Sequence, residues 1–476
     1  MSGAAELAMA AILRKKGRRN NKPSSGVTQE VEVERVPENQ PQNPFTEIHI
    51  LASHSDVIRT IIPLDGHRFL SVSDDHTAIV WSTNSSSPLC VLTGHTGPVI
   101  CSATMMSVQH DEDRAYPLKE QVLLTGSLDK TIRVWSLDTG ECMRVLKDHF
   151  TYVKVLCDSC VENLFCAGGT DLHLWNLEGD LLHTVILNGE DISHVLAIPH
   201  GRIVVAAANT LEVFKVPTSP EILQELEKIK KLAPNHREMI LSLETLSGSH
   251  FVSSSLDGTI IIWNSTNLTM LIQLNHQKDY LVNHTYPYCV HHTLSIDQKF
   301  LFAAVGRGLA LYTLNGDCIW RRENAHHSKI LYLCLVYNGM FLASCSEDGS
   351  IRLWGAVGSM EQPTEGSMLL HKEISDSSLE RLLGKSVNSK EKKRLLRKED
   401  KYKIPSPVLL GECMSHSGAV QKVLAFDDNT MVSCGSDGVI ILWKDGAQES
   451  ELRNEQIRKI LHFNSVKDEM PQESQS

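Results

Sequence analysis

Histidine, serine or threonine, and aspartate recur along the chain at regular spacing, each time ahead of a tryptophan. Four sets stand out: His95, Thr125, Asp129 and Trp135; His236, Ser253, Asp257 and Trp263; His327, Ser344, Asp348 and Trp354; His416, Ser433, Asp437 and Trp443. These residue types could form triads in which histidine takes a proton from a hydroxyl nucleophile. Because an enzyme does not repeat its nucleophile around the molecule, the repetition favours a structural role over hydrolysis.

A lone Cys-x-x-Cys pair, Cys157 and Cys160, is the second candidate for chemistry. A structural zinc site takes four ligands, and the sequence has no second such pair to complete one. We therefore favour two thiols at strand ends over a metal site, and we expect no cofactor. The twelve cysteines are scattered through apolar stretches, which indicates buried free thiols in a reducing compartment.

The tryptophans close copies of one longer motif, in which small polar residues, an acid and a β-branched run precede the aromatic ring. Strong copies end at Trp81, Trp135, Trp263, Trp354 and Trp443, and weaker ones at Trp175, Phe214 and Tyr312. Each copy predicts two strands joined by a tight turn, since Asp-Gly or Asp-Lys lies where a hairpin turn needs it. Five histidines precede their tryptophan by 26 or 27 residues: His54, His149, His236, His327 and His416.

Repeats of about 40 residues with histidine and tryptophan landmarks are typical of one repeat architecture. From about Asn43 to Trp443 the chain resembles the WD40-repeat β-propeller family. The resemblance implies an all-β propeller of eight blades over residues 43–446, with four strands, a to d, in each blade. It also implies that the four residues of each strong set form a hydrogen-bonded tetrad, which would satisfy the buried indole N–H.

A strand without a blade of its own precedes the first repeat, at Pro44–Leu51. The last repeat ends at Trp443 and lacks a fourth strand, so we expect residues 44–51 to supply it and close the ring. The fourth blade poses a conflict, because Ser219-Pro220-Glu221 and the ILQELEKIKKL that follows look like a capped helix. Since the ring needs a strand there, we expect one near 225–232.

Two insertions and two tails are added to the ring. Residues 106–120 are expected to interrupt strands a and b of the second blade, and residues 356–405 strands c and d of the seventh. The longer insertion is rich in lysine and arginine near its end, and is either a solvated loop or a docking loop for an acidic partner or an anionic membrane. Residues 1–42 are expected to be a disordered tail, with a transit peptide or nuclear localisation segment as alternatives.

The C-terminal residues 447–476 are expected to contain a short amphipathic helix near 449–463 and a tail. Its apolar residues recur near helical spacing, at Leu452, Ile457, Ile460 and Leu461. Two roles are open for this helix. It either packs back on the ring beside blade eight or docks to a partner.

Four segments resemble one narrower WD40 family more closely than propellers in general: NPFTEIHILASHSDVIR, FAAVGRGLALYTL, CSEDGSIRLW and ILWKDGAQESELR. That resemblance implies a non-catalytic scaffold subunit associated with two DENN-domain proteins, the Smith–Magenis syndrome chromosome region candidate 8 protein and the chromosome 9 open reading frame 72 protein. The implied assembly is a guanine-nucleotide exchange complex that regulates small GTPases and autophagy. A lysosomal PQ-loop cationic amino-acid transporter would recruit it from the cytoplasm to the lysosomal membrane surface.

The same resemblance assigns two contact surfaces. The DENN contact would use the closing strand and the C-terminal helix, through Phe45, Ile48, Ile50, Leu452, Ile457, Ile460 and Leu461. The transporter would dock on the insertion at 356–405. This loop departs from the family in lacking an aromatic-rich tip, since Tyr402 is its single aromatic residue. Met360, Met368, Leu369 and Leu370 are the nearest apolar substitutes.

The sequence lacks the features that several other functions would require. A net charge of −11 argues against nucleic-acid binding, and no apolar run reaches the length of a transmembrane helix. An enzyme would need a phosphate loop, a metal cluster or an unrepeated acid–base set. The alternative is a substrate receptor of a cullin–RING ubiquitin ligase or another generic WD40 adaptor. Such receptors often carry Trp-Asp-x-Arg, and none of these tryptophans is followed by aspartate.

Overall fold

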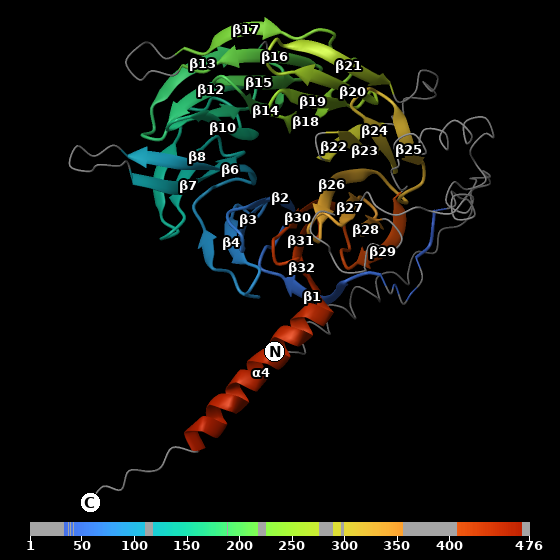
Figure 1. The fold of residues 1–476 in the computed structure, drawn as a ribbon. Coiled ribbons are helices and arrows are strands. Elements are labelled where there is room, and N and C mark those ends of the chain that lie inside the picture. The colour runs from blue at the N-terminus through green and yellow to red at the C-terminus, as the bar shows by residue number, and fades with distance from the viewer. Residues whose placement is uncertain are drawn as a thin grey trace, which may run out of the picture.

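The described residues of the computed structural model form eight four-stranded antiparallel sheets arranged in a ring, with one helix outside it (Figure 1). The described ranges are 33–36, 38, 40, 42–109, 118–187, 189–217, 225–275, 289–296, 299–355 and 407–468. The eight-bladed propeller expected from the repeat is therefore confirmed. The predictions for residues 356–405, which include Met368, Leu369 and Leu370, fall outside the described residues, as does Ser219-Pro220-Glu221.

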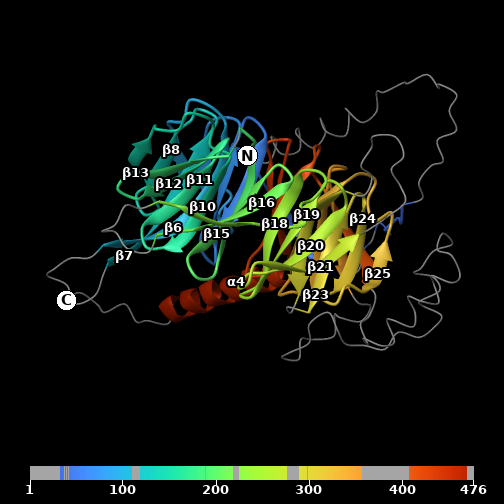
Figure 2. The ribbon, with the colours of Figure 1, turned by 90° about the horizontal axis from the view of Figure 1, so that it is seen from above.

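Each blade places its first strand innermost and its last strand at the rim of the ring (Figure 1). Figure 2 shows the same ring from its edge. The first four blades are made of β2 (Ile58–Pro63), β3 (Arg68–Ser73), β4 (Ala78–Ser82) and β5 (Cys90–Leu92); β6 (Val99–Gln109), β7 (Leu118–Ser127), β8 (Ile132–Ser136) and β9 (Cys142–Leu146); β10 (Val155–Val161), β11 (Leu164–Gly168), β12 (Asp171–Asn176) and β13 (Leu181–Ile186); β14 (Ile192–Ile198), β15 (Arg202–Ala207), β16 (Thr210–Lys215) and β17 (Glu227–Lys231).

The other four blades follow the same order. They are made of β18 (Ile240–Ser247), β19 (His250–Ser255), β20 (Thr259–Asn264) and β21 (Thr269–Asn275); β22 (Val290–Ile296), β23 (Phe300–Val305), β24 (Gly308–Thr313) and β25 (Cys318–Arg322); β26 (Ile330–Val336), β27 (Phe341–Ser346), β28 (Ser350–Gly355) and β29 (Val408–Met414); β30 (Val420–Ala425), β31 (Met431–Gly435), β32 (Ile440–Asp445) and the N-terminal β1 (Phe45–Leu51).

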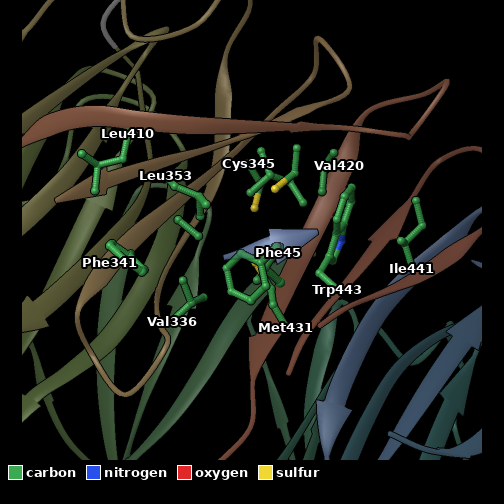
Figure 3. Packing of buried hydrophobic residues seen from close by; sticks show 14 residues of the cluster. Phe45, Val336, Phe341, Cys345, Leu353, Leu410, Val420, Met431, Ile441 and Trp443 are labelled. Carbon is green, nitrogen blue, oxygen red and sulfur yellow. The ribbon is translucent and has the colours of Figure 1, made fainter. Parts of the chain in front are cut away.

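Strand β1 closes the ring, as predicted. It pairs antiparallel with β32 from Phe45 opposite Asp445 to Leu51 opposite Ile440. Phe45 is buried in a hydrophobic cluster between blades seven and eight, where Phe341, Met431 and Trp443 also lie (Figure 3). Closure by a strand from the other end of the chain gives blade eight its fourth strand, which covers the edge of β32 and leaves β1 as the outer strand.

Of two local expectations about strands, one is confirmed and the other is wrong. β17 falls within the range where a strand was expected in place of a helix. The insertion expected at 106–120 does not interrupt the second blade, because the β6–β7 register continues without a break from Cys101 to Gln109. The added residues lengthen the hairpin instead. The Asn163 side chain of blade three also bonds the backbone N–H and C=O of Val108 in this extension, at 2.8 and 2.7 Å.

Described residues ahead of β1 (33–36, 38, 40, 42 and 43), here called the N-terminal strap, contact blades six and seven. Val33 is buried, and Glu34 forms an ion pair with Arg322 of β25. Farther along, the Gln40 side-chain oxygen accepts a hydrogen bond from the Glu412 N–H of β29 at 2.7 Å. This corrects the expectation of a disordered tail reaching residue 42, because the strap satisfies polar groups on the outer strands that it crosses.

The C-terminal helix α4 (Gly446–Asp468) begins directly after β32 and extends beyond the outline of the ring (Figure 1). It is longer than the expected 449–463 and contacts β1 and β32. Leu452 and Ile457 are 46% and 53% exposed, so these two side chains do not pack back on the ring. They lie five residues apart, about 140° around the helix, and therefore do not share one narrow face.

Candidate functional site: buried tetrads and the closing seam

The second blade holds a complete tetrad. The indole N–H of Trp135 donates to Thr125 Oγ1 at 2.8 Å, Thr125 Oγ1 lies 2.8 Å from His95 Nε2, and His95 Nδ1 lies 2.9 Å from Asp129 Oδ2. Because an ionised aspartate can only accept, Nδ1 carries the proton and donates it, and Nε2 accepts from the threonine. Blade eight repeats the arrangement with His416, Asp437, Ser433 and Trp443. Blade one does so with His54, Asp75, Ser71 and Trp81, a set not among the four predicted from the sequence.

The fifth blade contains a variation on the predicted set. His236 Nε2 lies 2.8 Å from Ser253 Oγ, which accepts the indole N–H of Trp263 at 2.9 Å. His236 Nδ1, however, contacts Thr259 Oγ1 at 2.6 Å, and that hydroxyl donates to Asp257 Oδ1 at 2.6 Å. The aspartate therefore joins this tetrad through one added hydroxyl group.

The histidine predicted in the seventh blade is wrong by one residue. His326 lies 2.7 Å from Ser344 Oγ through Nε2 and 3.3 Å from Asp348 Oδ2 through Nδ1. His327, the predicted member, has its ring outside the tetrad and contributes only its backbone N–H, which donates to Asp348 Oδ2 at 2.9 Å. Two adjacent histidines fit the spacing to Trp354 almost equally well. The buried one is His326, whose side chain is 0% exposed.

The third blade lacks most of a tetrad. The indole N–H of Trp175 donates directly to His149 Nε2 at 3.2 Å, where the other tetrads interpose a hydroxyl. Ala167 lies on β11 opposite His173, so the position that carries Thr125 in blade two has no hydroxyl here. His149 Nδ1 and both ring nitrogens of His173 are buried without a hydrogen-bond partner among the described residues, and the two rings stand 4.2 Å apart.

Burial sets the protonation of these histidines. Burial lowers the pKa of His54 and of His95, although the neighbouring aspartate opposes the shift in each case. Burial also lowers the pKa of His236 to about 4 and that of His149 to about 3. In the other direction, burial would raise the pKa of Asp129, but hydrogen bonds from Thr131, Thr96 and His95 outweigh it and lower the pKa to about 2. At neutral pH the tetrads of blades one, two and five therefore pair neutral imidazoles with ionised carboxylates.

The hydroxyl groups of the tetrads are buried in the core. The oxygen-bearing residues Ser71, Thr125, Ser253, Ser344 and Ser433 are all 0% exposed. Each hydroxyl oxygen also accepts an indole N–H, so no substrate carbonyl can reach it. These sets consequently stabilise blades, and the geometry offers them no route to acyl-transfer chemistry.

The Cys157–Cys160 pair lies on β10. Burial raises the pKa of Cys157 to about 12 and also raises that of Cys160, which keeps both thiols protonated. In the described part of the chain, no group of three or more histidine, cysteine, aspartate or glutamate side chains is placed to hold a metal ion. None of the helices described has the length and apolar character needed to cross a membrane.

We call the surface around β1 and the first turns of α4 the closing seam; it comprises Glu47, Ile48, Ile50, Leu452, Arg453 and Ile457. It combines exposed apolar side chains with an ion pair between the strand and the helix. Ile48 and Ile50 are 41% and 44% exposed on β1, whereas Phe45 is buried in the core and is removed from the predicted contact set. Glu47 of β1 forms an ion pair with Arg453 of α4 at 2.9 Å. The side chains of Ile460 and Leu461 lie outside the described residues.

Comparison with known proteins places this propeller in a family. The family model described as the WDR41 β-propeller matches residues 16–453. The chain belongs to the WDR41 family. WD repeat-containing protein 41 of Homo sapiens is 32% identical over 445 residues, which cover 90% of this chain and 94% of the human protein. The Mus musculus protein of the same name is 31% identical, with 90% and 93% coverage.

A solved structure supports the fold of this WDR41 family member independently. The crystal structure of the computationally designed Ika8 protein matches with a TM-score of 0.57 at 19% identity, covering 83% of this chain and 98% of the designed one. At that identity the likeness shows the fold alone. WDR41-family propellers are scaffold-type WD40 proteins, a class that is generally non-enzymatic, and the sealed tetrads agree with this.

Proposed function

We propose that this chain is a non-catalytic scaffold and recruitment subunit of a complex with two DENN-domain proteins. The partners are the Smith–Magenis syndrome chromosome region candidate 8 protein and the chromosome 9 open reading frame 72 protein. The complex regulates small GTPases and autophagy. The observation that carries the proposal is the WDR41-family match along nearly the whole propeller, including the weak blades, which a generic adaptor would not share.

The closing seam supplies a surface suited to a partner. β1 is the last strand of its sheet, so one of its edges has no neighbouring strand in the described chain. Its exposed Ile48 and Ile50 stand beside a helix that exposes Leu452 and Ile457. Partner interfaces gather exposed apolar side chains within a polar rim, and Glu47 and Arg453 provide charged groups here.

Recruitment to the lysosomal membrane surface is the second part of the proposal. A PQ-loop cationic amino-acid transporter would hold the complex there, with the blade-seven insertion at 356–405 as the docking segment. Met368, Leu369 and Leu370 are its apolar candidates, in a loop that is otherwise polar and rich in lysine and arginine.

Affinity purification of the tagged full chain from cells, with mass spectrometry of what binds, tests the DENN assignment. Both DENN-domain proteins should be recovered with the wild type, and their absence would sink the proposal. A variant with Leu452→Ser and Ile457→Ser should recover less of both. Ile186→Ser on β13, where the side chain is 77% exposed far from the seam, is the matched control and should recover the wild-type amount.

The lysosomal part has its own test. Replacing Met368, Leu369 and Leu370 with serine should abolish co-localisation with lysosomes while leaving recovery of the DENN-domain proteins unchanged. If the triple variant still reaches lysosomes as the wild type does, these residues do not dock the transporter. Loss of both readouts would point to a folding defect, which the unfolding temperature of the purified variant would reveal.

A further inference from the structure

The innermost strands share a bulge that defines a ring of equivalent residues around the propeller axis. In seven blades the register between the first two strands shifts at the same place, and the residue after the shift is Thr60, Cys101, His194, Ser242, His292, Tyr332 or Lys422. These strands face the centre of the ring in Figure 1. Residues far apart in sequence therefore meet at one level near the axis.

Lys422 is the one charged residue among these seven. Its ammonium nitrogen lies 5.5 Å from the centre of the Tyr332 ring and 3.5 Å from Thr60 Oγ1. Among the described residues no carboxylate lies within ion-pairing distance of it. The half-buried ammonium group therefore has no counter-charge within ion-pairing distance in the described part of the chain, and a bound anion would supply one.

The bulge position does not itself require a charge. The equivalent residue in blade two is Cys101, which lies opposite Gly126 just as Lys422 lies opposite Cys434. A neutral side chain thus fits the same place in the same fold. Because the fold does not need a charge at this position, the lysine indicates a ligand-binding role.

Other polar groups near the axis also lack partners. His194 Nδ1, His292 Nδ1 and Ser242 Oγ are buried without a hydrogen bond in the described part of the molecule. The His292 ring stacks obliquely on Tyr332, with 4.1 Å between ring centres. Lys422, Tyr332 and Thr60 are only half-buried, so a small ligand can reach them from the axis.

We propose that Lys422, with the hydroxyl groups of Thr60 and Tyr332, binds an oxyanion at the propeller axis. The ligand class is a carboxylate or a phosphate, which would accept hydrogen bonds from an ammonium and two hydroxyls and neutralise the lysine. Such a group could be a free anion or an acidic side chain inserted by a bound peptide. This site goes beyond the proposed scaffold function and does not depend on it.

Glu244 provides a charge of the opposite sign for the test. Its carboxylate lies 3.5 Å from His292 Nε2, and it acts electrostatically on Lys422. An anion at Lys422 would be repelled by this carboxylate. Removing the glutamate charge should therefore strengthen anion binding, whereas removing the lysine charge should weaken it.

Line broadening of inorganic phosphate in ³¹P NMR, titrated with the full chain at constant ionic strength, measures the site directly. The wild type should broaden the signal, and Lys422→Met should weaken binding by about tenfold or more, as expected for loss of a charged hydrogen-bond donor. Glu244→Gln should tighten binding several-fold. Lys228→Met on β17, which removes an exposed lysine paired with Glu212, is the matched control and should bind as the wild type does.

Equal broadening by wild type and Lys422→Met would overturn the proposal, as would no broadening by the wild type. If Lys422→Met does not fold, Tyr332→Phe removes only a hydroxyl and should still weaken binding measurably. Competition separates the two sources of the anion. Displacement of phosphate by a short glutamate-rich peptide identifies a site open to acidic side chains, and retention of phosphate identifies a free-anion site.

Discussion

The hydroxyl group of Tyr337 donates a hydrogen bond to Asp445 Oδ2 at 2.7 Å. Tyr337 follows β26 of blade seven, and Asp445 is the last residue of β32 in blade eight. The other oxygen of the same carboxylate accepts the backbone N–H of Ala447 at 3.0 Å and that of Gln448 at 3.3 Å, which caps α4. A single side chain therefore joins two neighbouring blades to the start of the helix.

Removing this carboxylate should affect the helix more than the ring. In Asp445→Ala the first turn of α4 loses its cap, which costs about 1–2 kcal/mol of helix stability and should lower the helical ellipticity near 222 nm. Tyr337→Phe removes the bond between the blades but leaves the cap, so its helical signal should stay at the wild-type level. Equal helical loss in both variants would show that the cap does not hold the helix.

The correction in blade seven predicts a sharp contrast between adjacent residues. His326→Ala should lower the free energy of unfolding by roughly 2–4 kcal/mol, because it leaves Ser344 and Asp348 with unsatisfied buried groups. His327→Ala should change it by less than about 0.5 kcal/mol, as its ring lies outside the tetrad. Chemical denaturation of both variants measures the difference. The reverse order would restore His327 to the tetrad.

Acid should destabilise the ring first through its histidines. The folded-state pKa of His236 is about 4 and that of His149 about 3, both lowered by burial from an ordinary value of 6.5. Depressed values mean that the unfolded chain binds more protons, so stability present above pH 6.5 is lost as the pH falls toward these values. Between pH 6.5 and 5 each such histidine should remove roughly 1.5 kcal/mol from the free energy of unfolding.

Replacing one titrating histidine tests that account. His149→Phe should make the free energy of unfolding depend less steeply on pH between 6.5 and 4, whatever it does to stability at pH 7. Asp129, whose folded pKa is about 2, should add a separate loss only below about pH 3.8. An unchanged slope in His149→Phe would mean that this histidine titrates normally in the folded protein.

Closure by β1 makes the N-terminal segment essential to a blade at the other end of the chain. Phe45→Ala should cost about 3–5 kcal/mol, because it empties a buried aromatic site between blades seven and eight. Ile48→Ala on the same strand is the control, since its side chain is 41% exposed and its loss should cost well under 1 kcal/mol. Thermal unfolding of the two variants should separate them by several degrees, and similar values would contradict closure through Phe45.

The number of blades and the way in which the ring closes could both be predicted from the repeat in the sequence. Eight copies of the motif, strong ones such as that ending at Trp81 and weak ones such as that ending at Tyr312, were enough to predict eight blades. The unpartnered strand at 44–51 was enough to predict closure. Alternation of apolar residues cannot rank two neighbouring histidines, however, so His326 was missed. The indirect link from His236 through Thr259 also depends on a rotamer that no spacing encodes.

Features that depend on tertiary contacts could not be predicted from the sequence. The N-terminal strap reads as a polar tail, and only its fit to Arg322 and Glu412 shows that it lies on blades six and seven. Likewise, the apolar residues of α4 suggested either packing on the ring or docking to a partner. Exposure of Leu452 and Ile457 excludes packing of these two side chains on the ring. The ring of residues around Lys422 becomes visible only when the equivalent bulges of seven distant strands are compared in the structure.

The affinity of the purified full chain for the purified pair of DENN-domain proteins tests the central claim most directly. The scaffold account predicts a stable complex that the Leu452→Ser, Ile457→Ser variant weakens at least tenfold, while Ile186→Ser leaves the affinity unchanged. Absence of binding by the wild type, or equal affinity of the seam variant and the wild type, would contradict it.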